Sequence, residues 1–519
     1  MDFIRQTIKR NNQKGKGYSQ LTLEDDYIVP DVKSDMARII HTQGKIQIDE
    51  SKISNQSLWI SGRLNFVLLY RSDDDNKKLE AILGTIPFQE KILMDDLEDG
   101  DAVRIKGQVE DISASMINSR KLGIRAVINL EAVAENTENV EMTLGMEQGR
   151  DYQQKLSRRN IMVMTENRKD VLRIRKESDI PGSRPNMDEV IFTSGDIRNL
   201  EQNPTNDGIL IQGEAYVCLI YRCREDDQII CYETMIPFSG KVESEGMDPK
   251  DTYWLDIVPT SVEVEAREDY DGEPRTIGME IIFDIQLKIW KEQEMEILED
   301  FYSLEKKVIP EKESVRLEEL LVKNQAKIRL GDTFKLENSK EKMLQICCYR
   351  GDVTVENTKK EEGGLFVEGF LKVHILYMTS DEYMPMGHHE AFLPIEQLIE
   401  VPESDNPGWY ELQTDIQQLQ VNLLDGMEYE VKATVNLSVI AFEDVRIEKI
   451  LSAEEVGLDM EELQNQPGFV GYVVQENESL WDIAKNYHTT VEQIMRTNNL
   501  REEELPRGSK IMIVKEIAS

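Results

Sequence analysis

One pattern of nine residues decides the fold and occurs three times along the chain: GRLNFVLLY at 62–70, GEAYVCLIY at 213–221 and GFLKVHILY at 369–377. Each copy opens with glycine, ends with tyrosine and is rich in the aliphatic and aromatic residues that favour strands. The first two copies are apolar on both faces, which predicts an inner strand covered on both sides. In the third copy, Lys372 and His374 alternate with apolar residues, as in a half-buried strand.

The same register extends to landmarks on both sides of this pattern. A glycine lies 18 residues before the opening glycine of each copy: Gly44, Gly195 and Gly351. A proline follows each closing tyrosine after 16 or 17 residues: Pro87, Pro237 and Pro394. The copies are offset by 151 and then 156 residues, whereas a solenoid unit has about 20–50. The sequence therefore predicts whole domains in tandem.

Each copy is expected to be mostly β. Further strands are predicted near 103–109, 126–130, 262–266, 279–289 and 430–440. A short helix is expected before each first glycine, as at 35–40, and the glycines themselves are expected to mark bulges or turns within a sheet. Charged stretches at 139–169 and 293–325 are interpreted as linkers. The second linker is expected to be partly helical because Leu317, Leu320 and Leu321 follow helical spacing.

The predicted fold class is mainly β, with three tandem β-rich repeat domains, short helices and a small βααβ domain at the C-terminus. The 519 residues agree with three or four domains of about 150 residues. The expected boundaries are a basic tail at 1–16, a first repeat at 17–140, a linker and second repeat at 141–297, a linker and third repeat at 298–450, an acidic linker at 451–468 and the terminal domain at 469–515.

Composition narrows the classes of function. The net charge is −38, which disfavours binding to nucleic acid or to anionic lipid. No window has the roughly 20 apolar residues of a membrane span, and the basic N-terminus lacks the apolar core of a secretory signal. Five cysteines in 519 residues do not predict a disulfide framework. We therefore expect a reduced, cytosolic protein whose basic residues at 5–16 form a loose, solubilising tail.

The C-terminal residues 470–515 predict a compact unit of strand, helix, helix and strand. Tyr472-Val473-Val474 is expected to be a strand, and Ser479 followed by Asp482 is a capping box that predicts a helix start. Leu480, Ile483, Ala484 and Tyr487 then follow the spacing of one buried helix face. Thr490 with Gln493 predicts a second helix, and a strand is expected at 511–514.

This unit resembles a LysM module. The resemblance rests on the strand 472–474, the run Ser479-Leu480-Trp481-Asp482-Ile483-Ala484, and Asn498-Asn499-Leu500. The family usually has Gly-Asp-Thr before the leucine, whereas this chain has Asn477-Glu478-Ser479. In family members that bind N-acetylglucosamine polymers that loop forms part of the sugar groove, so the altered loop argues against glycan binding here.

Tandem acidic β domains followed by LysM resemble the SipL family of clostridial spore-coat morphogenesis proteins, whose repeats are called SPOCS domains. The resemblance implies a non-enzymatic adaptor of the mother-cell cytosol, located at the forespore surface. Such an adaptor would bind the coat-scaffold ATPase, stage IV sporulation protein A, through LysM and promote coat encasement. The alternative is a peptidoglycan-binding protein that uses LysM to hold glycan. An enzyme of polysaccharide metabolism is a third hypothesis.

Seven residues border the groove that the LysM pattern implies and are the candidate partner-binding residues: Glu478, Ser479, Leu480, Trp481, Asn499, Leu500 and Arg501. Trp481 lies one step off the buried helix face and is expected to be partly exposed. It either anchors a partner, as exposed aromatic residues often do, or packs against a neighbouring part of the chain.

No catalytic, cofactor or metal site is predicted. The phosphate-loop, dinucleotide, zinc-protease and serine-hydrolase motifs do not occur, and no acid pair recurs across the copies. His388-His389-Glu390 is interpreted as part of a solvated loop because no further ligands stand at metal-site spacing. His374 replaces Val67 and Cys218 of the other copies and is interpreted as a packing substitution. Cys347-Cys348 is expected to be buried as small apolar side chains.

Overall fold

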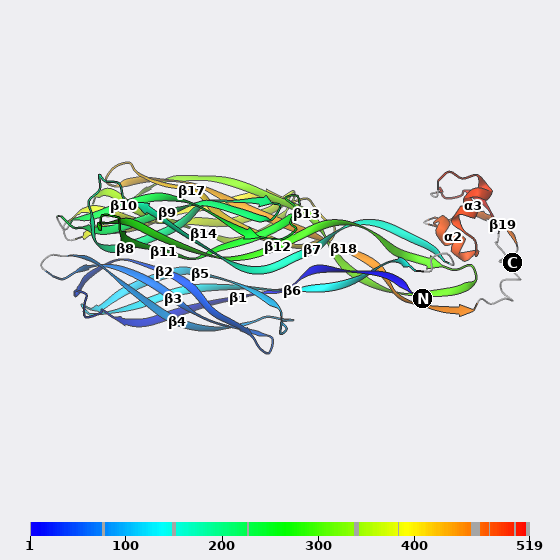
Figure 1. The fold of residues 1–519 in the computed structure, drawn as a ribbon, viewed down its shortest axis with the longest axis horizontal. Coiled ribbons are helices and arrows are strands. Elements are labelled where there is room, and N and C mark those ends of the chain that lie inside the picture. Colours follow the sequence, from blue (N-terminus) through cyan, green and yellow to red (C-terminus); the bar gives the residue numbers. More distant parts are fainter. Residues whose placement is uncertain are drawn as a thin grey trace.

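The computed structural model describes residues 2–74, 78–147, 152–225, 228–336, 342–381, 384–457, 468–476, 478–502 and 505–514 (Figure 1). The first repeat contributes β1 (Phe3–Ile28), β2 (Met36–Ile53), β3 (Ser57–Ser72), β4 (Leu79–Leu93), β5 (Ala102–Asn118) and β6 (Lys121–Met146). The second contributes β7 (Gln153–Asp179), β8 (Met187–Thr205), β9 (Gly208–Cys223), β10 (Ile229–Glu243), β11 (Thr252–Glu268) and β12 (Pro274–Tyr302). The third contributes β13 (Lys306–Lys335), β14 (Met343–Glu361), β15 (Gly364–Asp381), β16 (Met384–Glu400), β17 (Pro407–Leu423) and β18 (Glu428–Gly457).

Each repeat folds into two three-stranded antiparallel sheets. In the first repeat the strand orders are β2-β3-β4 and β1-β6-β5, and the other two repeats repeat this topology. The buried faces of the two sheets share one apolar core within each repeat. The predicted mainly β fold with tandem repeats is confirmed. Among the described residues no helix is both long and apolar enough to cross a membrane.

The Gly–Tyr pattern forms the central strand of a sheet in every repeat: β3, β9 and β15. Successive side chains of this strand point alternately into two different cores, which explains why both faces are apolar in the first copy. Leu64, Phe66 and Leu68 point into the core of their own repeat, whereas Val67 and Leu69 belong to a second core shared by all three repeats. The inner strand predicted from the sequence is confirmed, and its outer face is covered by neighbouring repeats.

The paired glycines are required by close approaches inside the sandwich. A Cβ atom on Gly62 would lie 2.5 Å from the carbonyl oxygen of Gln47 and 2.7 Å from the ring of Phe88, its cross-strand neighbour. A Cβ atom on Gly44 would lie 2.9 Å from Ile112 of the facing sheet. The pairing register shifts opposite Gly62, so a bulge lies where the sequence predicted one.

The three repeats contact one another in a closed ring and are not separate domains along an extended chain. Strand β4 of the first repeat contacts β8 of the second, β10 contacts β14 of the third, and β16 contacts β2 of the first. The same edge of each repeat therefore meets the same strand of the next repeat. A core of buried residues from all three repeats, including Leu69, Ile220 and Leu376, fills the centre of this ring.

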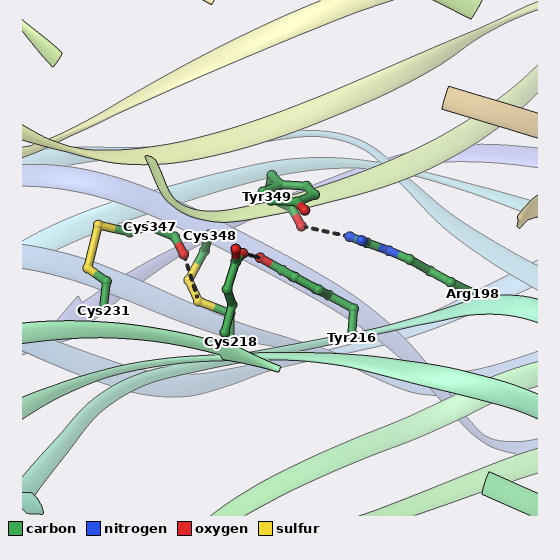
Figure 2. The surroundings of a disulfide bond; sticks show 8 residues. Arg198, Tyr216, Cys218, Cys231, Cys347, Cys348 and Tyr349 are labelled. Carbon is green, nitrogen blue, oxygen red and sulfur yellow. Dashed lines mark hydrogen bonds between the residues drawn. A yellow bond between two sulfur atoms is a disulfide. The ribbon is translucent and has the colours of Figure 1, made fainter. Parts of the chain in front are cut away.

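Two disulfide bonds join the second and third repeats (Figure 2). Cys218 bonds Cys348, and Cys231 bonds Cys347, with sequence separations of 130 and 116 residues. Beside them the buried guanidinium of Arg198 lies over the rings of Tyr216 and Tyr349 of the two repeats. Burial of Cys347 and Cys348 agrees with the sequence interpretation. The expectations of a reduced protein and of no disulfide framework are wrong. The bonded partners lie in different repeats, so their spacing carries no local signal.

The first and last strands of each repeat extend past the sandwich as paired strands, which we call the stalk: residues 3–13 with 135–146, 153–164 with 290–302, and 306–320 with 442–457. A one-residue bulge at Lys14, Thr165 and Leu321 separates sandwich from stalk in every repeat. The stalk core takes three apolar side chains from each repeat, among them Ile8 and Ile161. Figure 1 shows these strands running toward the C-terminal domain.

The stalk corrects several sequence predictions. Residues 5–16 belong to β1 and are not a loose tail, because Ile8 anchors them in the stalk core. Residues 139–146, 153–169, 293–302 and 306–325 are strands, so these two stretches are not linkers or a partial helix but consist mainly of β6, β7, β12 and β13. The expected helix at 35–40 is the start of β2. Of the predicted acidic linker 451–468, residues 451–457 end β18, and 458–467 lie outside the described residues.

A buried ion network connects all three repeats where the sandwich meets the stalk. The Nζ atom of Lys288 lies 2.5 Å from a carboxylate oxygen of Glu135 and 2.6 Å from one of Glu411. These residues come from β12, β6 and β17, and all are buried. Arg104 also pairs with Glu411 and with Asp256 of β11. Because each charge has a partner in another repeat, separating the repeats would leave buried charges unpaired.

Candidate partner-binding site

The C-terminal module consists of β19 (Phe469–Val473), α2 (Leu480–Asn486), α3 (Val491–Asn498) and β20 (Lys510–Val514). Helix α2 begins with the predicted capping box, in which Ser479 accepts from the backbone of Asp482 and the Asp482 side chain accepts from the backbone of Ser479. Thr490 caps α3 by accepting a hydrogen bond from the backbone of Gln493. The predicted βααβ order is confirmed.

The module is attached to the tip of the stalk through one face of α2. The indole Nε1 of Trp481 donates to Asp300 Oδ2 at 2.9 Å, and Lys485 Nζ donates to both Asp300 oxygens at 2.8 and 2.7 Å. The Trp481 ring also meets Tyr302 edge-on, with centroids 4.9 Å apart. The hydroxyl of Tyr302 donates to the carbonyl of Thr489 at 2.8 Å. The last residues of β12 therefore provide both the charge and the aromatic surface that hold the module.

Electrostatics support this attachment. Burial alone would raise the pKa of Asp300, but the hydrogen bonds from Lys485 and Trp481 outweigh burial and lower it. Asp300 therefore stays ionised at neutral pH and keeps its ion pair with Lys485. Of the two readings of Trp481, the structure favours packing against the chain itself.

The other candidate residues take different positions. Leu480 is buried in the module core, where Leu500 also packs. The carboxylate of Glu478 accepts from the hydroxyl of Tyr472 at 2.7 Å, and this hydrogen bond raises the pKa of Tyr472 to about 12. Ser479 caps α2, while Asn499 ends α3 in the left-handed conformation with φ of 52°. Asn499 and Arg501 are exposed. Of the seven candidates, these two and Ser479 are the exposed ones.

The two-stranded sheet β19-β20 of the module has an exposed apolar surface that was not predicted from the sequence. Phe469 and Val473 of β19 and Met512 of β20 are 64%, 45% and 47% exposed, while Ile511 and Ile513, on either side of Met512, face the core. Gly471 pairs with Met512 in the register, so these three side chains share the outer face. The alternation of β20, lysine–isoleucine–methionine–isoleucine, was the available signal.

The position of His388-His389-Glu390 also differs from the sequence prediction. His388, His389 and Glu390 lie in strand β16, not in a solvated loop, and His388 lies beside His374 and the buried His41. Lys372 pairs with Glu390 at 3.0 Å. His374 is therefore part of a polar cluster between the third and first repeats, rather than a substitution that only fills space.

The matches to known families coincide with the repeats and with the C-terminal module. Three stretches, residues 35–117, 174–267 and 342–424, match the family model described as SipL, SPOCS domain, and together they make up half of the chain. The chain belongs to the SipL SPOCS-domain family. Residues 472–513 match the LysM domain model. No curated protein and no solved structure matches the chain.

The SPOCS matches take in β2–β5 and the corresponding strands of the other repeats. The structure adds the long first and last strands, β1 and β6 in the first repeat, which build the stalk. Both matched families are non-catalytic binding domains, and SipL is a sporulation family. The chain is therefore a sporulation-related protein that combines three SPOCS domains with one LysM domain.

Proposed function

We propose that this chain is a non-enzymatic adaptor of spore-coat assembly. In this proposal the LysM module binds the coat-scaffold ATPase, stage IV sporulation protein A, in the mother-cell cytosol, and the three repeats carry that contact at the forespore surface. The family membership supports the setting. The ring of three repeats supports the proposed role of the repeats as a carrier of the LysM contact. Because the repeats share packed cores, they form one rigid body to which the module is attached.

The single observation that carries the proposal is the attachment of the module. Asp300 and Tyr302 cover the Trp481 side of α2, so the module has a fixed orientation on the stalk. The corner formed by Asn499 and Arg501 remains exposed, and arginine is among the residues most often central to protein interfaces. We therefore assign direct partner contact to this corner, and we assign to Trp481 the role of positioning it.

Pull-down of stage IV sporulation protein A from sporulating cells tests the assignment. Arg501→Glu should reduce recovery at least about tenfold, which corresponds to about 1.4 kcal/mol of binding free energy. Arg125→Glu is the matched control, since Arg125 is an exposed arginine of β6 with 65% side-chain exposure. Unchanged recovery with Arg501→Glu would count against the proposed corner.

Two further variants separate positioning from contact. Asp300→Ala and Trp481→Ala each remove one partner of the hydrogen bond that holds the module, so both should weaken pull-down. The two factors will differ, because Asp300→Ala also loses the contact with Lys485 and Trp481→Ala also loses the contact with Tyr302. If Trp481→Ala abolished recovery and Asp300→Ala left it intact, Trp481 would contact the partner directly, contrary to the positioning role.

The LysM match is also the observation that favours the second candidate, a peptidoglycan or N-acetylglucosamine binder. The local geometry argues against it, because Glu478 turns back onto Tyr472 and places a carboxylate in the loop that would contact sugar. Sedimentation with purified sacculi provides the test. Retention of the wild-type chain that is lost in Arg501→Glu would favour the glycan-binding function.

A further inference from the structure

The three junctions of the ring use equivalent positions but different chemistry. The strand registers align His41 with Phe192 and Cys348, because each pairs with the residue before the closing tyrosine of its repeat. The same registers align Ala81 with Cys231 and His388. Position 374 in turn aligns with Val67 and Cys218, three residues before the tyrosine.

These alignments place histidines at the third junction where the second junction has cysteines. Cys218 and Cys231 of the second repeat bond Cys348 and Cys347 of the third. At the equivalent positions, His374 and His388 of the third repeat face His41 of the first. The ring centroids of His41 and His388 are 4.2 Å apart, and those of His374 and His388 are 5.7 Å apart. The chain has only five histidines, so three of them converge here.

The cluster has the donors of a metal site. One ligand atom from each of His374, His388 and Glu390 lies within 4.8 Å of the others. A tetrahedral Zn²⁺ with bonds of about 2.1 Å needs donors about 3.4 Å apart, so modest side-chain rotations bring them into place. His41 Nδ1 and His388 Nε2 are buried and have no hydrogen-bond partner among the described residues. Buried polar atoms of this kind require a partner.

The surroundings also suit a cation. Asp352 Oδ2 lies 3.5 Å from His374 Nε2, so it can orient that ring while Nδ1 faces Glu390 Oε1 at 3.1 Å. A surface hollow walled by β2, β5 and β16 opens onto His41 and gives an ion access.

We propose that His374, His388 and Glu390 of the third repeat, together with His41 of the first, bind a divalent transition metal, Zn²⁺ by donor type, and thereby close the ring of repeats. Imidazole with one carboxylate suits Zn²⁺ better than Mg²⁺ or Ca²⁺, which prefer oxygen donors. The metal would join the third repeat to the first at the position where disulfides join the second to the third.

Titration of the full chain tests the site, with disulfides kept oxidised and resident metal removed by a chelator that is then dialysed away. Calorimetry with ZnCl₂ should give one ion per chain. The cobalt(II) form should show visible absorption of a tetrahedral nitrogen and oxygen site, without the near-ultraviolet band of thiolate ligation. His388→Ala and Glu390→Gln should each weaken Zn²⁺ binding at least about tenfold, since even outer-sphere changes cost 10–100-fold.

His389→Ala is the matched control. His389 is adjacent in sequence but bonds the hydroxyl of Tyr429 at 2.6 Å, so its loss should leave Zn²⁺ affinity unchanged. His41→Val should weaken binding and abolish the Zn²⁺-dependent rise in melting temperature. Circular dichroism of each metal-free variant checks folding. Absence of Zn²⁺ binding in the wild type, or binding unaffected by both His388→Ala and Glu390→Gln, would overturn the site. Full affinity in His41→Val would overturn ring closure by the metal.

Discussion

Replacement of Lys288 by methionine is the sharpest test that the three repeats form one body. Lys288 is 1% exposed and bridges Glu135 of the first repeat and Glu411 of the third. Methionine has similar length but no charge, so Lys288→Met removes the bridge with little change in volume. Arg104 still pairs with Glu411, which leaves Glu135 as the carboxylate without a cation.

The expected loss can be estimated in two ways. Breaking a buried ion pair by removing one partner costs about 3–5 kcal/mol. Independently, burial would raise the pKa of Glu411, but the charges of Lys288 and Arg104 outweigh it and lower the pKa to about 2. A carboxyl about two units below its ordinary value contributes about 3 kcal/mol, at 1.36 kcal/mol per unit; Lys288 and Arg104 share this contribution, so Lys288→Met loses only part of it, and the larger loss comes from Glu135. We therefore expect Lys288→Met to lower the free energy of unfolding by about 3–5 kcal/mol.

The pH dependence has a definite sign. Because the folded pKa of Glu411 is lowered, its contribution is fully present above its unfolded pKa, about 4.3, and is lost as the pH falls toward 2. Opposing carboxylates outweigh burial and raise the pKa of Lys288, so its contribution is present below its unfolded pKa, about 10.4, and is lost at higher pH. The difference between wild type and Lys288→Met should therefore be largest from about pH 5 to 10.

Urea unfolding followed by fluorescence and calorimetry at pH 7 measures this difference. Lys335→Met is the matched control, because Lys335 pairs with Glu428 at 2.9 Å on the surface and its side chain is 69% exposed. The control should unfold like the wild type. Stability of Lys288→Met equal to that of the control would show that the buried bridge does not hold the repeats together.

Three further predictions concern other contacts. Asp300→Ala should loosen the attachment of the module to the stalk, detected as faster hydrogen exchange in α2 around Trp481 and Lys485; exchange equal to wild type would contradict the role of Asp300 in the attachment. Reducing both disulfides should lower the melting temperature, because each typically contributes about 2–4 kcal/mol; a temperature unaffected by reductant would exclude a structural role. Gly213→Ala should destabilise the second repeat by about 1–3 kcal/mol, since its Cβ would lie 2.8 Å from the aromatic ring of Phe238. Wild-type stability in urea would show that the Phe238 side chain moves aside at no cost.

Much of the fold could be predicted because the decisive signals are local. The Gly–Tyr pattern marks a central strand, and the glycine spacing reports close packing against Phe88 and Ile112. The stalk could not be predicted in the same way. Its strands have many exposed charged residues, and only alternate or isolated apolar residues such as Ile8 face the core. These highly charged stretches were therefore interpreted as linkers or a tail.

The site residues show the same division. The caps and core of the LysM module follow spacings of three and four residues and could be predicted from the sequence. The partner of Trp481 could not, because Asp300 lies 181 residues earlier in the chain. The histidine cluster and the disulfides likewise join residues from different repeats. The glycine, tyrosine and proline landmarks align these positions in the sequence, but only the structure shows which of them face each other across the repeats.

The most direct test of the adaptor function compares the two candidate ligands on one purified sample. Full-length chain is passed over immobilised stage IV sporulation protein A and, in a parallel channel, over immobilised N-acetylglucosamine oligomers. An adaptor should show saturable binding to the protein that Arg501→Glu weakens, and no binding to the sugar. Binding to the oligomers with none to the protein would contradict it.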